Sequence, residues 1–126
     1  MSFADNQKLR QSLIATYEDC PSVDRGVLQL MSIIYEGVGK TTLMDYIRRC
    51  EFPAFKGLSP AILTQIINRL IRQNLVVKGD HSQMRCHILL IEEMTQRAVQ
   101  GGHFAAMAKA VQERKGSAVH DSWMYF

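Results

Sequence analysis

Glycine, lysine and threonine at positions 39–41 are the residues of this 126-residue chain that first suggest phosphate chemistry. The same triplet ends the phosphate-binding loop of many nucleotide hydrolases, where a buried strand leads into the loop and another glycine stands five residues earlier. Here that earlier position is Ile34, the preceding segment has helical periodicity, and no later strand ends in an aspartate that could hold Mg²⁺. We therefore interpret the segment as a junction between two helices. Lys40 would then be exposed at the start of the later helix, where it could contact a phosphate.

Residues 59–74 carry a second set of side chains that could do chemistry. Ser59 followed by Pro60 is typical of a helix start. In this helix the branched aliphatic side chains share one face, and a stripe of small and polar side chains lies opposite. The stripe consists of Ala61, Thr64, Gln65, Asn68 and Arg72. Hydroxyl, amide and guanidinium groups match the donors and acceptors of base edges in DNA. The alternative is a surface helix with an accidental polar face.

Positive charge is concentrated in the central part of the chain. Between Val38 and His87 there are eight basic and three acidic residues, whereas the remainder has seven basic and nine acidic ones. This segregation is typical of a surface that binds a polyanion, although a solvated surface can acquire it by chance. The residues that we expect at a DNA surface are Lys40, Lys56, Ser59, Pro60, Ala61, Thr64, Gln65, Asn68, Arg69, Arg72, Lys78 and Arg85.

Helices and a hairpin must position these side chains. Apolar periodicity and turn residues predict helices at 4–18, from 23 to the glycines at 37 and 39, at 40–50, at 59–74 and at 92–115, with strands at 75–78 and 85–91. We expect Gly37 and Gly39 to end the second helix in a left-handed turn, and Thr41 or Thr42 to cap the third. Gly101-Gly102 marks a weak point in the last helix.

The predicted order of elements is mostly α with a small β-hairpin. Three helices followed by a hairpin form a winged helix-turn-helix, here a single domain over 1–126 with extra N- and C-terminal helices. Its core spans 20–92, and the flanking helices are 4–18 and 92–115. In the hairpin, Arg85 lies just past the turn, Lys78 lies across from it and His81 is at the tip. A basic tip can follow the minor groove of DNA, and a solvated charge is the alternative at Arg85.

Residues 59–98 contain a series of short motifs, namely Leu63-Thr64, Asn68-Arg69-Leu70, Leu75-Val76, Asp80 with Arg85, and Met94-Thr95-Gln96-Arg97-Ala98. With these motifs the segment resembles the DNA-binding lobe of MarR-type transcription regulators. The resemblance implies a homodimer with interleaved terminal helices, a recognition helix 59–74 in the major groove, and a wing 75–91 on the minor groove. The partners would be double-stranded DNA and a small-molecule or protein effector. The sequence departs from the family in a longer link at 50–57 and a slightly short wing.

A different class of function is also open at this stage. A winged helix can serve as a protein–protein interaction module within a larger assembly. The long link with Phe52 and Phe55, and the aromatic end from Trp123 to Phe126, support this alternative.

The sequence offers no arrangement of catalytic side chains, so we expect no enzyme and no cofactor. Cys86 and His87 are neighbours on a strand and point to opposite faces, which argues against a metal site. Cys20 follows Glu18 and Asp19, which should raise the pKa of its thiol and slow its oxidation. No apolar run approaches the ~18–20 residues of a membrane span, and the start lacks the apolar segment of a secretory signal. We therefore expect a cytoplasmic protein with no membrane partner.

Overall fold

The computed structural model describes residues 3–123, and the side chains of residues 3–114. Its elements in chain order are α1 (Phe3–Glu18), α2 (Ser22–Ile34), α3 (Lys40–Arg49), the short 3-10 helix η1 (Pro53–Phe55), α4 (Pro60–Arg72), β1 (Val76–Lys78), η2 (Asp80–Ser82), β2 (Met84–Cys86), η3 (Ile88–Leu90), α5 (Ile91–Gln100) and α6 (Phe104–Trp123). The expectation of a mostly helical chain with one antiparallel hairpin is confirmed. Within residues 3–123, no helix combines the length and the apolar character that a membrane crossing requires.

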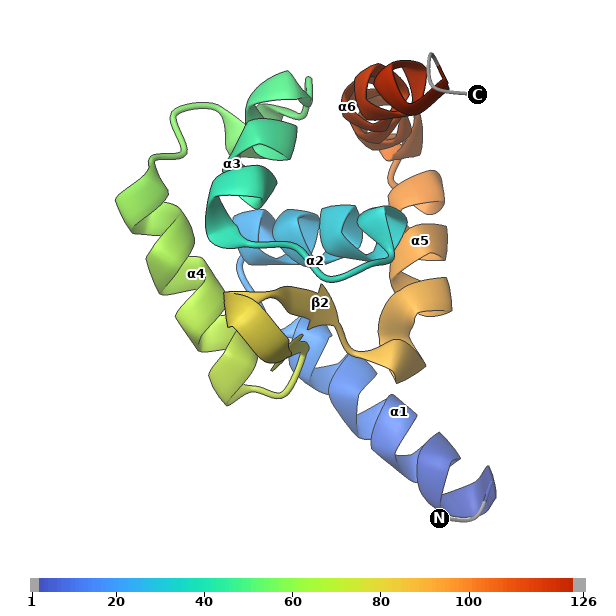
Figure 1. The fold of residues 1–126 in the computed structure, drawn as a ribbon. Helices are drawn as coiled ribbons and strands as arrows, with labels where there is room; N and C mark the ends of the chain where they lie inside the picture. Colours follow the sequence, from blue (N-terminus) through green and yellow to red (C-terminus); the bar gives the residue numbers. More distant parts are fainter. Residues whose placement is uncertain (1–2, 124–126) are drawn as a thin grey trace.

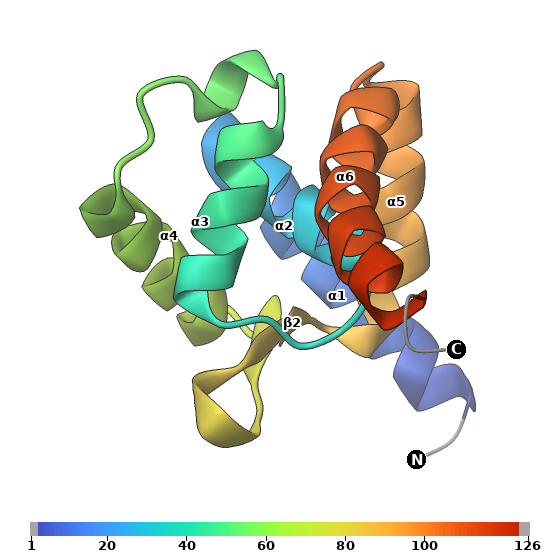
Figure 2. The same cartoon turned by 45° about the horizontal axis from the view of Figure 1, so that its top comes forward.

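Helix α2 lies at the centre of the fold. Nine of its residues are buried, because apolar side chains occur on most of its sides. Helices α3 and α4 lie on one side of α2, and α5 and α6 lie on the other (Figures 1 and 2). The loop of the hairpin projects beyond the helices (Figure 2), and the N-terminal half of α1 projects away from the body (Figure 1).

The junction between α2 and α3 differs from the expected glycine turn. The residue with a left-handed backbone is Tyr35, at φ 73°, and neither Gly37 nor Gly39 adopts a positive φ. Val38 is buried and pairs with Met84 of β2 through two backbone hydrogen bonds of 2.8 and 2.9 Å. This pairing requires an extended backbone here, so the reversal occurs before the glycines. Helix α3 starts at Lys40, which rules out the predicted caps at Thr41 and Thr42.

The hairpin is shorter than predicted. The strand expected at 85–91 ends at Cys86, and Ile88–Leu90 forms the turn η3, which leads into α5. The ring Nδ1 of His87 accepts a hydrogen bond from the Leu89 amide at 3.1 Å and so stabilises this turn. A short apolar run does not distinguish a strand from a buried helical turn. The register also differs from expectation, because Arg85 pairs with Val77 and Lys78 pairs with Met84.

The C-terminal segment forms two helices where one was predicted. Gly102, at φ 81°, separates α5 from α6, and α6 continues to Trp123. Helix α5 packs on α2, α6 packs on α2 and α3, and Met107 and Val111 of α6 are buried. A buried amide connects this region to α1, since Gln29 donates to the Tyr17 hydroxyl at 2.5 Å and contacts the His103 ring.

Candidate nucleic-acid interface

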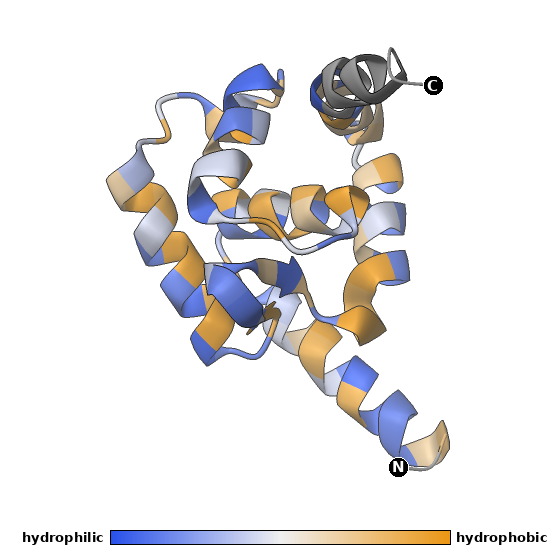
Figure 3. Cartoon of the chain, in the orientation of Figure 1, coloured by the Kyte–Doolittle hydropathy of each residue, from blue (hydrophilic) through white to orange (hydrophobic). Residues whose placement is uncertain are grey.

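Helix α4 turns one apolar face inward and one polar face outward, as its sequence predicts. The Ser59 hydroxyl accepts a hydrogen bond from the Ile62 amide at 3.2 Å, and Pro60 occupies the first helical position. Four branched aliphatic residues are buried, namely Leu63, Ile66, Ile67 and Leu70. The exposed residues of the opposite face are Ala61, Gln65, Asn68 and Arg72. Along α4, hydrophobic and hydrophilic positions alternate (Figure 3).

Two members of the predicted set on α4 have partners inside the chain. Thr64 is half-buried, and its hydroxyl donates to the Pro60 carbonyl at 3.0 Å. Arg69 donates from Nε and Nη2 to the buried carboxylate of Asp24, at 3.0 and 2.9 Å. These hydrogen bonds raise the pKa of Arg69. Arg69 therefore anchors the back of α4, and we leave it out of the set that faces solvent.

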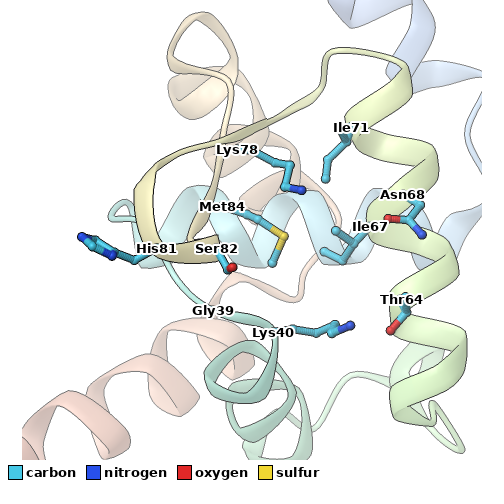
Figure 4. Close-up of a pocket in the computed structure, with 10 residues that line it drawn as sticks. All are labelled: Gly39, Lys40, Thr64, Ile67, Asn68, Ile71, Lys78, His81, Ser82 and Met84. Carbon is cyan, nitrogen blue, oxygen red and sulfur yellow. The ribbon is translucent and has the colours of Figure 1, made fainter.

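A groove runs between α4 and the hairpin (Figure 4). Its volume is about 290 Å³. Lys40 enters from the start of α3 and Lys78 from β1, and both side chains extend toward α4. Thr64 and Asn68 line the wall that α4 supplies, whereas the ring of His81 points away from the groove. Residues far apart in sequence are thus brought together by the pairing of Val38 with the hairpin.

The remaining predicted cations do not line this groove. Lys56 is exposed beside a hollow that the α3–α4 link encloses, and Arg48 lines the same hollow. Arg48 also lies with Lys40 and Pro60 in a smaller hollow between α3 and α4. Arg85 is on the outer face of the hairpin, since its strand partner Val77 and not Lys78 shares that face. Lys78 consequently faces α4, on the other side of the strand.

Sequence reasoning missed Arg48 and Ser82. Arg48 lies two helical turns after Thr41 on the same face of α3, and this seven-residue spacing is the signal that could have identified it. Ser82 lines the α4–hairpin groove. It does so through a left-handed backbone, at φ 60°, which its residue type does not predict.

Most basic residues of the central segment, Val38 to His87, form no salt bridge with a described side chain. Six basic residues form salt bridges within the described part of the chain: Arg10, Arg49, Arg69, Arg97, Lys109 and Arg114. In the central segment, six others form none with any described side chain: Lys40, Arg48, Lys56, Arg72, Lys78 and Arg85. Helices α3 and α4 also lack an acidic residue in their first turns. Their N-terminal ends therefore keep an uncompensated positive dipole.

The two features that favoured an interaction module are the aromatic link between α3 and α4 and the aromatic end of the chain. Phe55 is buried, and Phe52 packs edge-on against it with ring centroids 4.9 Å apart. A Cβ on Gly26 would come within 2.6 Å of the Phe52 ring, so the link lies closely on α2. The two aromatic rings of the link therefore pack against the core, whereas Pro53, Lys56 and Gly57 stay exposed. At the C-terminus, the Trp123 side chain and residues 124–126 lie outside the described residues.

The cysteines are buried and reduced. Burial is the main cause that raises the pKa of all three thiols, to about 11 for Cys50 and about 12 for Cys86. For Cys20 the pKa is also raised, and the carboxylates of Asp24 and Asp19 add to the effect of burial. The expected direction is confirmed, but burial is the larger cause, and Asp24 rather than Glu18 acts together with Asp19. Within the described residues, no group of three or more His, Cys, Asp or Glu side chains is arranged to hold a metal ion.

No protein-family model, curated protein or solved structure matches this chain. The resemblance to MarR-type regulators therefore depends on the sequence motifs alone.

Proposed function

We propose that this chain is a winged helix-turn-helix protein that binds double-stranded DNA sequence-specifically and acts as a transcription regulator. The order α2, α3, α4 and hairpin, with the extended Val38 joined to β2, supports a winged arrangement. One observation carries the proposal: the exposed amide and guanidinium groups of α4 are bordered by cations that have no carboxylate partner among the described residues. Base edges and phosphates require these two kinds of group side by side.

In this proposal α4 enters the major groove. Gln65 and Asn68 hydrogen-bond to base edges, with adenine as the best match for an amide, and Arg72 contacts guanine or a phosphate. The helix enters the major groove with its N-terminal end, which consists of Ser59, Pro60 and Ala61. Lys40, Lys56 and Arg48 bind phosphates beside it.

The hairpin has two faces with different roles. Arg85 faces outward and approaches the adjacent minor groove, in which narrow stretches attract arginine. Lys78 faces α4 and holds a phosphate at the edge of the major groove. This division replaces the single basic tip expected from the sequence.

A homodimer, which the family resemblance implies, would need a surface other than the one expected. Leu13, Tyr17, Met107 and Val111 are buried within one chain, so they are not available to a second copy. The projecting end of α1 keeps Phe3 and Leu9 exposed. We therefore propose a dimer interface formed by α1 alone.

Selection of binding sites from random duplexes, followed by titration in increasing salt, tests the proposal. We expect Arg72→Ala and Arg85→Ala each to weaken DNA binding and to lower the salt slope by about one. Gln65→Ala and Asn68→Ala should instead reduce discrimination between sites by about 1–3 kcal/mol. Lys109→Ala is the matched control, because Lys109 is an exposed cation on α6, away from both the proposed DNA surface and the proposed dimer surface.

Equal affinity in the wild type and both arginine variants would refute this binding mode. Absence of any DNA binding at about 50 mM salt would favour the interaction module, since basic DNA-binding proteins keep non-specific affinity there.

A further inference from the structure

The groove between α4 and the hairpin has the size of a small-ligand site. Its volume of about 290 Å³ lies close to the lower end of the range, about 300–1,000 Å³, that is usual for such sites. One wall consists of Thr64, Ile67, Asn68 and Ile71, which are three, four and seven residues apart and so share one face of α4. Ser82 and Met84 of the hairpin form the other wall.

The lining combines an apolar floor with polar groups above it. Ile67 and Met84 are almost fully buried, at 3% and 5% exposure, and present hydrocarbon and sulfur to the groove. The Asn68 amide and the Ser82 hydroxyl are exposed and offer donors and acceptors. An organic group with a flat apolar face and a polar edge fits this lining.

The charge of the groove favours an anion. Lys40 and Lys78 extend into it from opposite sides (Figure 4), and neither forms a salt bridge with a described side chain. Among the described residues no carboxylate lines it, whereas the hollow behind the α3–α4 link includes Glu51 and the one outside the hairpin includes Asp80. Two lysines that enter a small groove from opposite sides match a compact dianion such as a phosphate monoester.

From these features we propose that the groove binds an organic phosphate monoester of about mononucleotide size. The phosphate lies between Lys40 and Lys78, and the organic group lies on Ile67 and Met84. A single phosphate monoester can enter the groove, whether it is a free ligand or the end of a nucleic-acid strand.

A regulatory consequence follows, and it alone depends on the proposed DNA binding. Lys40 and Lys78 are expected to hold DNA phosphates as well, so a ligand in the groove would occupy the same cations. Asn68 belongs both to the exposed face of α4 and to the groove wall. A bound phosphate monoester should therefore compete with DNA.

Amide chemical shifts during titration of the full chain with AMP test the site directly. We expect saturable shifts at residues 39–41, 64–71 and 78–84, and about tenfold weaker binding of adenosine or inorganic phosphate. Lys40→Gln and Lys78→Gln should each weaken AMP binding by about tenfold, whereas Lys8→Gln should leave it unchanged. A five-nucleotide strand with a 5′-phosphate provides the second source of the same chemistry.

The outcomes separate this proposal from the DNA-binding proposal. No saturable shift up to about 10 mM AMP, or equal binding of AMP and inorganic phosphate, would overturn the ligand site. If the five-nucleotide strand shifts the same amides and binds about tenfold more tightly than AMP, the proposal of a free ligand is overturned. The groove would then be a site for the end of a nucleic-acid strand. Saturable AMP binding without any DNA binding would uphold the site and remove only the competition.

Discussion

Arg69 of α4 forms a salt bridge with Asp24 near the start of α2. Its Nε and Nη2 donate to the two carboxylate oxygens at 3.0 and 2.9 Å, and the Asp24 side chain is 1% exposed. Two parallel hydrogen bonds define the direction of the guanidinium as well as its distance from the carboxylate. The pair therefore limits rotation of α4 about its own axis. This restraint acts in the same direction as the buried aliphatic face of the helix, opposite which Gln65 and Asn68 are exposed.

Removal of this arginine should destabilise the chain. Arg69→Ala leaves a buried carboxylate without its partner, and we expect the free energy of unfolding to fall by about 2–3 kcal/mol at pH 7. Arg69→Lys should recover only part of this loss, because an ammonium cannot make both hydrogen bonds in parallel. Urea denaturation measures the effect. An unchanged midpoint for Arg69→Ala would show that Asp24 is satisfied in another way.

Glu93 should make the stability depend on acid pH. Arg97 donates to it at 2.8 Å and lowers its pKa below the usual 4.5, and Arg10 adds a second hydrogen bond at 2.9 Å. Because the pKa is lower in the folded state, this stabilisation is complete above about pH 4.5 and is lost as the pH falls through the folded-state value. Glu93→Gln should cost about 1 kcal/mol at pH 7, and this cost should become smaller as the pH falls below about 4.5.

Unfolding free energies of both proteins at pH 7 and pH 3 provide the measurement. Glu51→Gln is the control, because Glu51 is exposed and forms no salt bridge with a described side chain. An equal loss for Glu93→Gln at pH 7 and pH 3 would contradict the prediction.

The thiols should react slowly in the folded protein. A pKa of about 11 at Cys50 leaves about one thousandth of the thiol as thiolate at pH 8, and Cys86 has even less. Cys20 also has a raised pKa, and its thiol donates weakly to the Thr16 carbonyl at 3.4 Å. A thiol-specific chromogenic reagent should modify three cysteines quickly in denaturant and none quickly without it. Rapid native modification of Cys20 would instead favour a redox role.

The sequence was sufficient to predict α4 and its two faces. The Ser59-Pro60 start, the spacing of the aliphatic residues and the polar stripe are all local signals, and the structure confirms each of them. The burial of α2 also followed from its composition.

Features that depend on distant residues could not be predicted in this way. Asp24 and Arg69 are 45 residues apart, so the charge of Arg69 looked available to DNA. The pairing of Val38 with Met84 requires an extended backbone after α2. The register of the hairpin sets the face on which Lys78 lies. The apolar run at 88–91 fits a strand or a helical turn equally well. The hydrogen bond from the Leu89 amide to the His87 ring stabilises the turn.

Gly39 offers a test in which stability and anion binding change in opposite directions. It is the N-cap of α3, with φ −77° and ψ 165°, and an added Cβ would meet no atom within 4 Å. An aspartate in this conformation can accept a hydrogen bond from the first turn and interact favourably with the helix dipole. We expect Gly39→Asp to gain about 0.5 kcal/mol and to raise Tm by about 2 °C.

The same carboxylate would line the groove beside Lys40. It should repel phosphate, so Gly39→Asp should weaken DNA and AMP binding by about tenfold or more despite its greater stability. Gly39→Ser is the matched control, because a serine caps the helix without adding charge and should leave binding close to the wild-type value. Thermal unfolding and titrations of the three proteins decide the matter. Binding by Gly39→Asp as tight as that by Gly39→Ser would show that the groove and the start of α3 face no phosphate.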